Sequence, residues 1–287
     1  MTRISLTHRT DLAARQACLF DLHADYGIAY LVERDGRQGL FVNDVLWYAW
    51  PKRTDARSMK IKWLDRDRVI LDLGGRETAI LSAEAGALFD FDYVYWLVVS
   101  ARRIFVGYSE EELFCFHSED EPEYYGLCAF SHEGVFEFGL RTLLEETKCQ
   151  TGPDEIHAAY AHGERLIFPA MLEKFIRILD IEEPRLEMIA PQPPLGSLRV
   201  MWGDDKTALA ISGLRRTDRP VTSDTYQLAA IDLVNRTTRK LDFAPLESDL
   251  VSAGFRIDVL DFQPSASGRI IATDGALAAF VDMVVSS

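Results

Sequence analysis

The chain has 287 residues, of which 48% are hydrophobic and 26% charged, a balance typical of a globular protein with enough apolar material for a large core. Its formal net charge of −14 argues against nucleic acid as a partner, because a protein binds a polyanion through clustered lysines and arginines, and it disfavours membrane binding through basic residues. The first residues lack the apolar core of a secretory signal and no apolar run approaches the ~20 residues that span a bilayer, so we expect a cytoplasmic protein.

The first predicted elements are short strands and one helix. Arg3–Thr7 alternates in the manner of a strand, and Thr10–Ala17 begins with a suitable cap and is predicted as a short helix. Ile28–Val32 and Leu40–Val42 follow on either side of an Asp-Gly turn. Such a turn between two apolar runs predicts a hairpin, since glycine tolerates the positive φ of a tight turn.

The same pattern recurs along the chain: a short apolar strand ends in a small or acidic residue, and a brief turn leads into a second strand. The residues that end these strands are spaced by 49 to 52 positions, and they are Glu33, Ser82, Ser131, Asp180, Asp232 and Asp282. Two further strand candidates precede most of them, such as Met59–Leu64 and Val69–Leu73 before Ser82. Phe175–Leu179 also matches helical spacing, but its place in the repeat favours a strand. Each copy is therefore predicted to be a four-stranded meander of about 50 residues.

This repeat predicts an all-β chain, and it resembles the β-propeller architecture, WD40-like or of a generic kind, across nearly its whole length. Asp261–Ala272, where a turn with proline and glycine joins two apolar strands, resembles the inner hairpin of a propeller blade. We expect a single domain over residues 1–287 with six blades of four antiparallel strands, although the spacing leaves a count of five to seven open. The sixth copy stops too soon for a fourth strand, so Arg3–Thr7 is predicted to complete the last blade. Two successive β-sandwiches are the alternative, but they do not require one constant spacing.

Propellers resemble one another in placing ligands on the face that carries the connections between blades and between the second and third strands. Here these connections are the longest predicted ones, namely Asn43–Ser58, Ser118–Tyr125, Arg141–Ile156, Ser212–Thr225 and Ala244–Phe255. Within them, Arg141–Lys148 is predicted as a short helix. Long loops on a rigid scaffold concentrate binding residues, so this face is the predicted functional face.

Two tryptophans in the first of these connections are candidate partner-binding residues. Trp47 and Trp50, followed by Lys52 and Arg53, offer aromatic and cationic anchors of the kind that dominate interface energies. Packing between blades explains one or both tryptophans as well.

Two charged runs are further candidates. Glu119 and Asp120 belong to an acidic run that suits a basic partner or a cation, although such runs are typical of solvated loops. Arg215 and Arg216 form a local basic patch that suits an anionic group, or that balances nearby carboxylates.

Cysteine and histidine residues invite a test for a zinc site. The four that lie on predicted strands are Cys115, His117, Cys128 and His132. Strand alternation puts the members of each pair on a common face, but their spacings match no standard zinc finger. Because Cys18 and Cys149 are scattered and no Cys-x-x-Cys pair occurs, we expect reduced, mostly buried thiols and neither a metal nor another cofactor.

The sequence contains no nucleophile elbow, P-loop, zinc-protease motif or dinucleotide fingerprint, and none of the repeat motifs of the sialidase, YWTD, kelch or WD40 propellers. We therefore expect a non-catalytic binding scaffold that uses the long-loop face around the central channel, and its negative charge suits a basic protein partner. That charge equally serves solubility. A hydrolase or lyase acting on a sugar or lactone, with carboxylates and histidines at the channel mouth, is the alternative. A structural ring within a larger assembly would instead show an exposed apolar patch.

Overall fold

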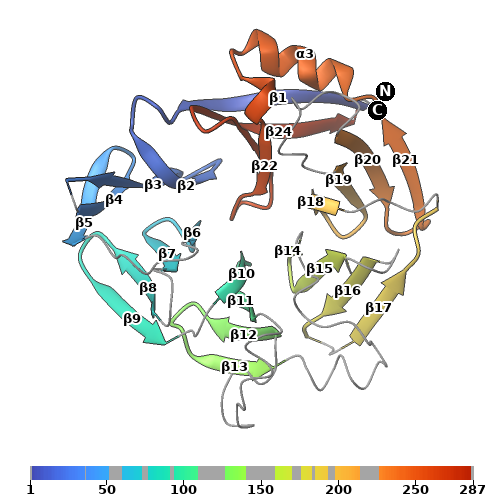
Figure 1. Ribbon diagram of the computed structural model, residues 1–287. Helices are drawn as coiled ribbons and strands as arrows, with labels where there is room; N and C mark the ends of the chain where they lie inside the picture. The colour runs from blue at the N-terminus through green and yellow to red at the C-terminus, as the bar shows by residue number, and fades with distance from the viewer. Residues whose placement is uncertain are drawn as a thin grey trace. The chain divides into compact units, whose positions relative to one another are not determined.

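The computed structural model describes residues 2–35, 37–51, 60–72, 77–90, 94–108, 127–139, 159–169, 176–182, 185–192, 198–213 and 226–285. They form six four-stranded antiparallel sheets, which we call blades 1 to 6 (Figure 1). The chain divides into two compact units: unit 1 comprises Met1–Arg15, His157–Leu179 and Glu187–Ser287, and unit 2 comprises Gln16–Ile156 and Asp180–Leu186. The single domain predicted over residues 1–287 stays a prediction. Within the described ranges, no helix has the length and apolar character needed to cross a bilayer.

Unit 2 contains blades 1, 2 and 3, in each of which the strands lie side by side in chain order. Blade 1 consists of β2 (Ala17–His23), β3 (Gly27–Arg34), β4 (Arg37–Val42) and β5 (Val45–Pro51). Blade 2 consists of β6 (Lys60–Trp63), β7 (Arg68–Asp72), β8 (Glu77–Ser82) and β9 (Gly86–Asp90). Blade 3 consists of β10 (Val94–Val99), β11 (Arg103–Tyr108), β12 (Leu127–Ser131) and β13 (Phe136–Gly139).

Unit 1 contains blades 5 and 6 and most of blade 4. Blade 4 consists of β14 (Tyr160–His162), β15 (Arg165–Pro169), β16 (Ile176–Asp180) and β17 (Arg185–Ile189). Blade 5 consists of β18 (Leu198–Gly203), β19 (Thr207–Gly213), β20 (Tyr226–Asp232) and β21 (Thr237–Leu241). Between blades 5 and 6 lie helix α3 (Ala244–Ser252) and the 3-10 turn η3 (Ile257–Val259). Blade 6 consists of β22 (Asp261–Pro264), β23 (Ile270–Thr273), β24 (Leu277–Val285) and β1 (Thr2–Asp11).

Blade 6 is completed by the first strand of the chain. β1 runs antiparallel to β24, with Thr2 opposite Val285, so the two ends of the described chain meet in one sheet (Figure 1). Just after β1, the backbone N–H of Leu12 donates to the carbonyl of Ala276 at 2.8 Å. The predicted all-β class, the six four-stranded blades and the closure by the N-terminal strand are confirmed.

The core of each blade lies mainly on its second and third strands, most of which are buried on both faces of the sheet, whereas in β4 of blade 1 burial alternates. In β7, for example, Val69, Ile70 and Leu71 are each 0% exposed, so the apolar run is continuous and does not alternate. This burial follows from packing between neighbouring blades, which covers both faces of a sheet. Blades 5 and 6 share one apolar cluster, to which Leu228 and Phe262 belong.

One repeat position and one element are predicted wrongly in blade 1. Glu33 lies on β3, the second strand of its blade, whereas Ser82 and the later repeat residues lie on third strands. The counting fails because the turn at Asp35, with φ of 52°, joins the second strand to the third, so the third strand of blade 1 ends later, at Val42. The helix predicted over Thr10–Ala17 is also wrong, because pairing with β24 extends β1 to Asp11. The helix predicted over Arg141–Lys148 lies outside the described residues.

Candidate functional site

The two ends of each blade differ in how the chain connects. In a four-stranded meander, the turns after the first and third strands lie at one end of the sheet, and the remaining connections lie at the other. We call these the short-turn end and the long-connection end. The connections at 109–126, 140–159, 214–225 and 242–260 all belong to the long-connection end. The last of them is fully described, whereas the predicted connections Ser118–Tyr125 and Arg141–Ile156 lie outside the described residues.

The connection between β21 and β22 folds into α3 because its sequence starts and stops a helix. Pro245 lies in the first turn, where its missing N–H leaves no intrahelical bond unmade. At the other end Gly254 has φ of 89°, and the N–H of Phe255 donates to the carbonyl of Leu250 at 3.0 Å, which is the bond of a Schellman motif. The segment Ala244–Phe255 is thus a long connection between blades, as predicted, but the helix within it was not predicted.

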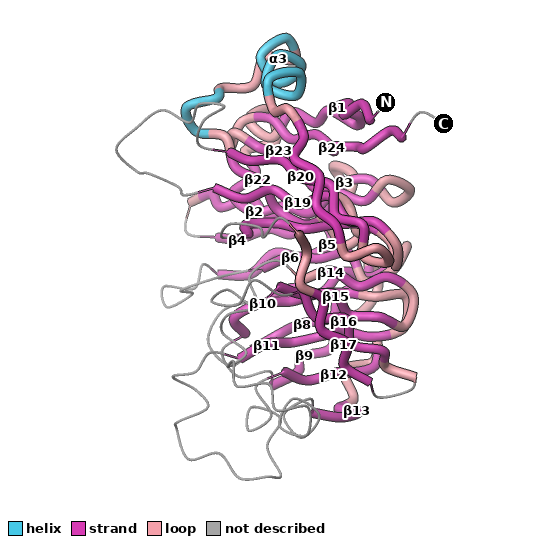
Figure 2. Tube along the Cα trace, turned by 90° about the vertical axis from the view of Figure 1, so that its right-hand side faces the viewer, coloured by secondary structure: helices cyan, strands magenta, loops and turns pink. Residues whose placement is uncertain are grey.

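One side of α3 is fixed to the body of unit 1. Leu246 and Leu250, one helical turn apart, are 0% exposed and join the apolar cluster of blades 5 and 6. Burying a leucine side chain stabilises a fold by about 1.5–3 kcal/mol. Figure 2 shows the helix in cyan beside β1, with which it is in contact. The helix is therefore a rigid feature of the long-connection end.

A buried carboxylate ties the end of this connection to blade 6. The Asp274 carboxylate accepts hydrogen bonds from the backbone N–H groups of Arg256 at 2.8 Å, of Ala276 at 2.8 Å and of Leu277 at 2.7 Å. Burial alone would raise the pKa of Asp274, but these N–H groups and the Arg256 guanidinium outweigh it and lower the pKa below its ordinary value. The carboxylate therefore stabilises the fold in its ionised form.

Replacing this carboxylate tests that role. We expect Asp274→Ala to lower the free energy of unfolding by about 2–4 kcal/mol at neutral pH, because it leaves three backbone N–H groups without their acceptor. Since the folded-state pKa is lowered, the stabilisation is complete above the unfolded-state pKa and is lost as the pH falls through the folded-state pKa. Urea denaturation should therefore show the gap to wild type shrinking in strong acid. Asp258→Ala, which removes an exposed carboxylate nearby, should stay within about 0.5 kcal/mol of wild type at every pH.

The other side of α3 and the turn that follows it face solvent. Val251 is 55% exposed and Val259 of η3 is 41% exposed. We call this outward face the α3 surface, and its members are Asp242, Pro245, Glu247, Ser248, Asp249, Val251, Ser252, Asp258 and Val259. Residues 242–260 contain four carboxylates and one arginine. Within the described residues, none of these four carboxylates makes an ion pair, since Arg256 instead binds Asp274 at 3.9 Å.

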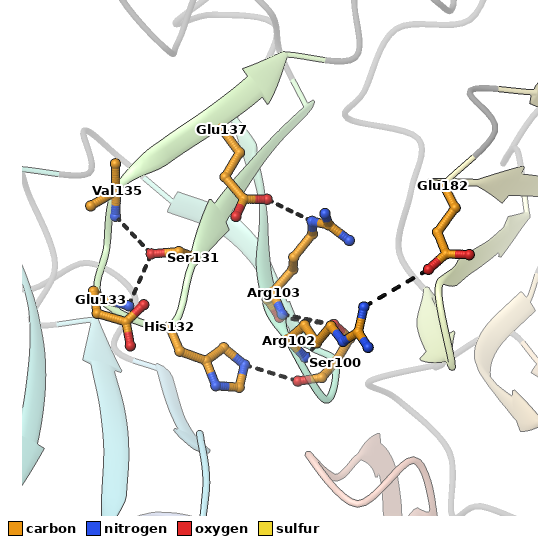
Figure 3. Close-up of polar contacts among 9 residues, drawn as sticks. All are labelled: Ser100, Arg102, Arg103, Ser131, His132, Glu133, Val135, Glu137 and Glu182. Atoms are coloured by element: carbon orange, nitrogen blue, oxygen red, sulfur yellow. Dashed lines mark hydrogen bonds and ion pairs between the residues drawn. The ribbon is translucent and has the colours of Figure 1, made fainter.

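At the short-turn end of blade 3, in contrast, the carboxylates form ion pairs with arginines (Figure 3). The Arg103 guanidinium lies 2.6 Å from the Glu137 carboxylate, and the Arg102 guanidinium lies 3.8 Å from the Glu182 carboxylate. Glu133 lies 3.7 Å from the guanidinium of Arg68 in blade 2. These three glutamates therefore each have an arginine partner, although Arg68 is shared with Asp65, which it binds at 2.7 Å.

Hydroxyl and imidazole groups order the same two turns. The Ser100 hydroxyl accepts from the backbone N–H of Arg103 at 2.9 Å, and the Ser131 hydroxyl accepts from that of Glu133 at 3.1 Å. Nε2 of His132 lies 3.0 Å from the Ser100 carbonyl, which can only accept, so the imidazole donates (Figure 3). His132 thus links the two short turns of blade 3, which is a structural role.

The segment of the two predicted tryptophans is a strand rather than a long connection. Asn43 and Asp44 have φ of 48° and 66°, the conformation of a two-residue hairpin turn, so β5 pairs with β4 at once. The Asn43 side chain supports this turn by accepting from the backbone N–H of Ile28 at 3.0 Å. The prediction of a connection over Asn43–Ser58 is therefore wrong as far as Pro51, and 52–59 lie outside the described residues.

Trp47 and Trp50 are both half-buried on β5. Trp50 lies opposite Gln38, and its indole N–H donates to the Gln38 side-chain oxygen at 3.0 Å. Gln38 is 1% exposed, so this tryptophan serves internal packing. Trp47 lies at an irregularity in the pairing of β4 with β5, where Tyr48 still has a partner on β4 and Trp47 has none. A partner-binding role for either tryptophan stays a prediction.

The other predicted site residues lie outside the described residues: Glu119, Asp120, Arg215 and Arg216, with Cys115, His117 and Cys149. Cys128 is buried on β12 as expected, whereas Cys18 is exposed. Among the described residues, no three histidine, cysteine or acidic side chains are placed to hold a metal ion.

Sequence reasoning missed two ion pairs with buried carboxylates in blades 1 and 2. Asp21 is 0% exposed and lies 3.6 Å from the Lys62 amine, and Asp72 is 2% exposed and lies 3.4 Å from the Lys60 amine. Burial lowers the pKa of Lys60 and the charge of Asp72 partly restores it. The available signal was the pair of lysines two positions apart in a short strand otherwise made of Ile61 and Trp63. The Asp21–Lys62 pair joins blade 1 to blade 2, whereas the Asp72–Lys60 pair joins two strands within blade 2.

No protein-family model matches the chain, and no curated protein matches it in sequence. Solved structures match it in fold. KlHsv2 with loop 6CD replaced by a Gly-Ser linker aligns with a TM-score of 0.54 at 11% identity, over 91% of this chain and 76% of that one. The WD40 domain of Neurospora crassa Pan2 aligns with a TM-score of 0.52 at 12% identity, over 96% of this chain and 97% of that one.

A chain of the mitotic checkpoint complex aligns with a TM-score of 0.53 at 11% identity, over 100% of this chain and 94% of that one. At such low identity these likenesses show the fold alone. The chain has the six-bladed β-propeller fold, with WD40 propellers among its structural neighbours, and no functional family within that fold is shown.

Proposed function

We propose that this chain is a non-catalytic, cytoplasmic interaction scaffold that binds a basic protein through its long-connection end. The observation that carries the proposal is the contrast in charge pairing. The carboxylates of the α3 surface have no cationic partner among the described residues, whereas Glu133 and Glu137 of blade 3 and Glu182 of blade 4, at the short-turn ends, each have an arginine partner. Unmatched exposed carboxylates attract a basic surface and speed its approach.

Two further facts support this proposal. The net charge of −14 favours a basic partner and disfavours nucleic acid and anionic membranes, which we infer are not bound. A chain of similar fold belongs to a solved protein complex, the mitotic checkpoint complex, so the fold is compatible with a scaffold role. The sugar- or lactone-processing alternative stays a prediction.

Capture under controlled salt tests the proposal. The immobilised chain should retain one or more basic proteins from native lysate at about 50 mM salt and release them by about 500 mM, because exposed charges are screened within the Debye length. The retained protein, once purified, should bind the purified chain again with the same salt dependence. Retention that does not change with salt, or the absence of any basic protein among those retained, would contradict the proposal.

A further inference from the structure

The α3 surface presents aliphatic groups beside carboxylates, and Val251 and Val259 stay exposed among the residues that the structure describes. Val251 lies one helical turn after Glu247, so the two side chains are neighbours on the helix. η3 is in contact with α3, which brings Val259 and Asp258 to the same part of unit 1. Val251 and Val259 therefore each lie beside a carboxylate, Glu247 and Asp258, that makes no ion pair among the described residues.

This face is also held in one conformation before any partner arrives. Leu246 and Leu250 anchor the buried side of the helix, and Asp274 accepts a hydrogen bond from the backbone N–H of Arg256, just before η3 begins. A surface that is already ordered loses little conformational entropy on binding. Contacts on it therefore count more towards affinity than contacts on a chain that must first be ordered.

We propose that the α3 surface is the docking site for a short basic segment of a protein partner, in which lysines or arginines flank an aliphatic residue. This inference rests on the proposed function and names the place and chemistry of the contact. The aliphatic residue packs on Val251 and Val259. The basic residues pair with Glu247, Asp249 and Asp258, which have no ion-pair partner within the described residues. The apolar contact supplies the short-range selectivity that charge alone lacks.

Fluorescence anisotropy with the full chain and two synthetic peptides tests this proposal. One labelled peptide of about ten residues alternates lysine and leucine, and the other replaces each leucine with serine. The triple variant Glu247→Gln, Asp249→Asn, Asp258→Asn is expected to weaken binding of both peptides at least about tenfold, as three ion pairs of about 0.5 kcal/mol each would require. Val251→Ser is expected to weaken the leucine peptide about threefold or more and to leave the serine peptide unchanged.

A matched control separates this site from net charge. The triple variant Glu133→Gln, Glu137→Gln, Glu182→Gln removes the same number of charges from the short-turn end, and it should weaken binding less than about threefold. Equal weakening by the two triple variants would overturn the α3 site, as would an equal effect of Val251→Ser on both peptides. If the free chain sediments as a dimer that Val251→Ser dissociates, the face serves self-association instead. Unchanged thermal unfolding of the variants shows that they are folded.

The outcome also separates this inference from the proposed function. If a basic protein is captured by the wild-type chain and equally by the α3 triple variant, the scaffold proposal stands and the docking site is wrong. If wild type captures no basic protein, both are wrong.

Discussion

A chain that lacks residues 1–12 should fail to keep unit 1 folded. The deletion removes β1 and exposes the whole edge of β24, with which β1 pairs from Thr2 to Asp11. It also removes Leu12, which is 1% exposed, and Leu6, which packs against the core cluster of blades 5 and 6. Losing one buried leucine, one half-buried leucine and a strand ladder costs about 5 kcal/mol, which matches the lower end of the stability of a whole domain at about 5–15 kcal/mol.

Size-exclusion chromatography and urea denaturation of the shortened chain measure this effect. We expect aggregation through the open edge of β24, or a first transition at a much lower urea concentration than in wild type. A peptide of residues 1–12 added in excess should restore the transition, because it binds only the folded form. Thr7→Ala, which removes a single hydrogen bond to Asp282, is the mild control and should lose about 1 kcal/mol. A shortened chain with wild-type stability would show that blade 6 holds with three strands.

Trp63→Ala is expected to be the most damaging single substitution between blades 1 and 2. Trp63 is 1% exposed, its indole N–H donates to the Gly27 carbonyl at 3.2 Å, and its ring meets that of Tyr26 edge-on at 5.6 Å. Truncating a buried tryptophan leaves a cavity and costs about 3–5 kcal/mol. The change should appear in urea denaturation as a lower midpoint with little change in slope.

Two further substitutions separate the contributions of hydrogen bonding and burial to the stabilisation by Trp63. Trp63→Phe keeps most of the ring but loses the hydrogen bond to Gly27, so it should cost roughly 1–2 kcal/mol. Trp202→Ala in blade 5, where the residue is half-buried, should cost less than Trp63→Ala. If Trp63→Ala lowered the free energy of unfolding no more than Trp202→Ala does, the residues around Trp63 would have to rearrange to fill the cavity.

The blade architecture was predictable because every blade repeats one chemistry. A buried strand, a short turn with glycine or an acidic residue and a second strand recur at near-constant spacing, so the sequence alone predicts Ser82, Ser131 and Asp232 at matching places on third strands. Blade 1 departs from the spacing, because the turn signal at Asp35 lies between its second and third strands, and the turn after its third strand, at Asn43 and Asp44, contains no glycine. Positive φ is uncommon outside glycine, although asparagine and aspartate tolerate it best, so this turn gave a weak signal.

The candidate site was less predictable than the fold. α3 was missed because Phe243, at its start, provides no side-chain cap, although Leu246 and Leu250 have the spacing of a buried helix face. The negative charge of residues 242–260 can be read from the sequence, but the lack of ion-pair partners for these carboxylates among the described residues cannot. Whether a carboxylate has an arginine beside it depends on which turns the fold brings together, as with Arg68 and Glu133, which lie far apart in the chain.

The pairing of β1 with β24 also means that blade 6 cannot be completed until late in synthesis of the chain. Thr7 and Asp282, which bond across this pair, are 275 positions apart. At a synthesis rate of 5–20 residues per second, the ribosome adds Asp282 roughly 15 to 55 seconds after Thr7. During that time β1 has no sheet to join, and its polar sequence, with Arg3 and Arg9, keeps it from pairing with other chains.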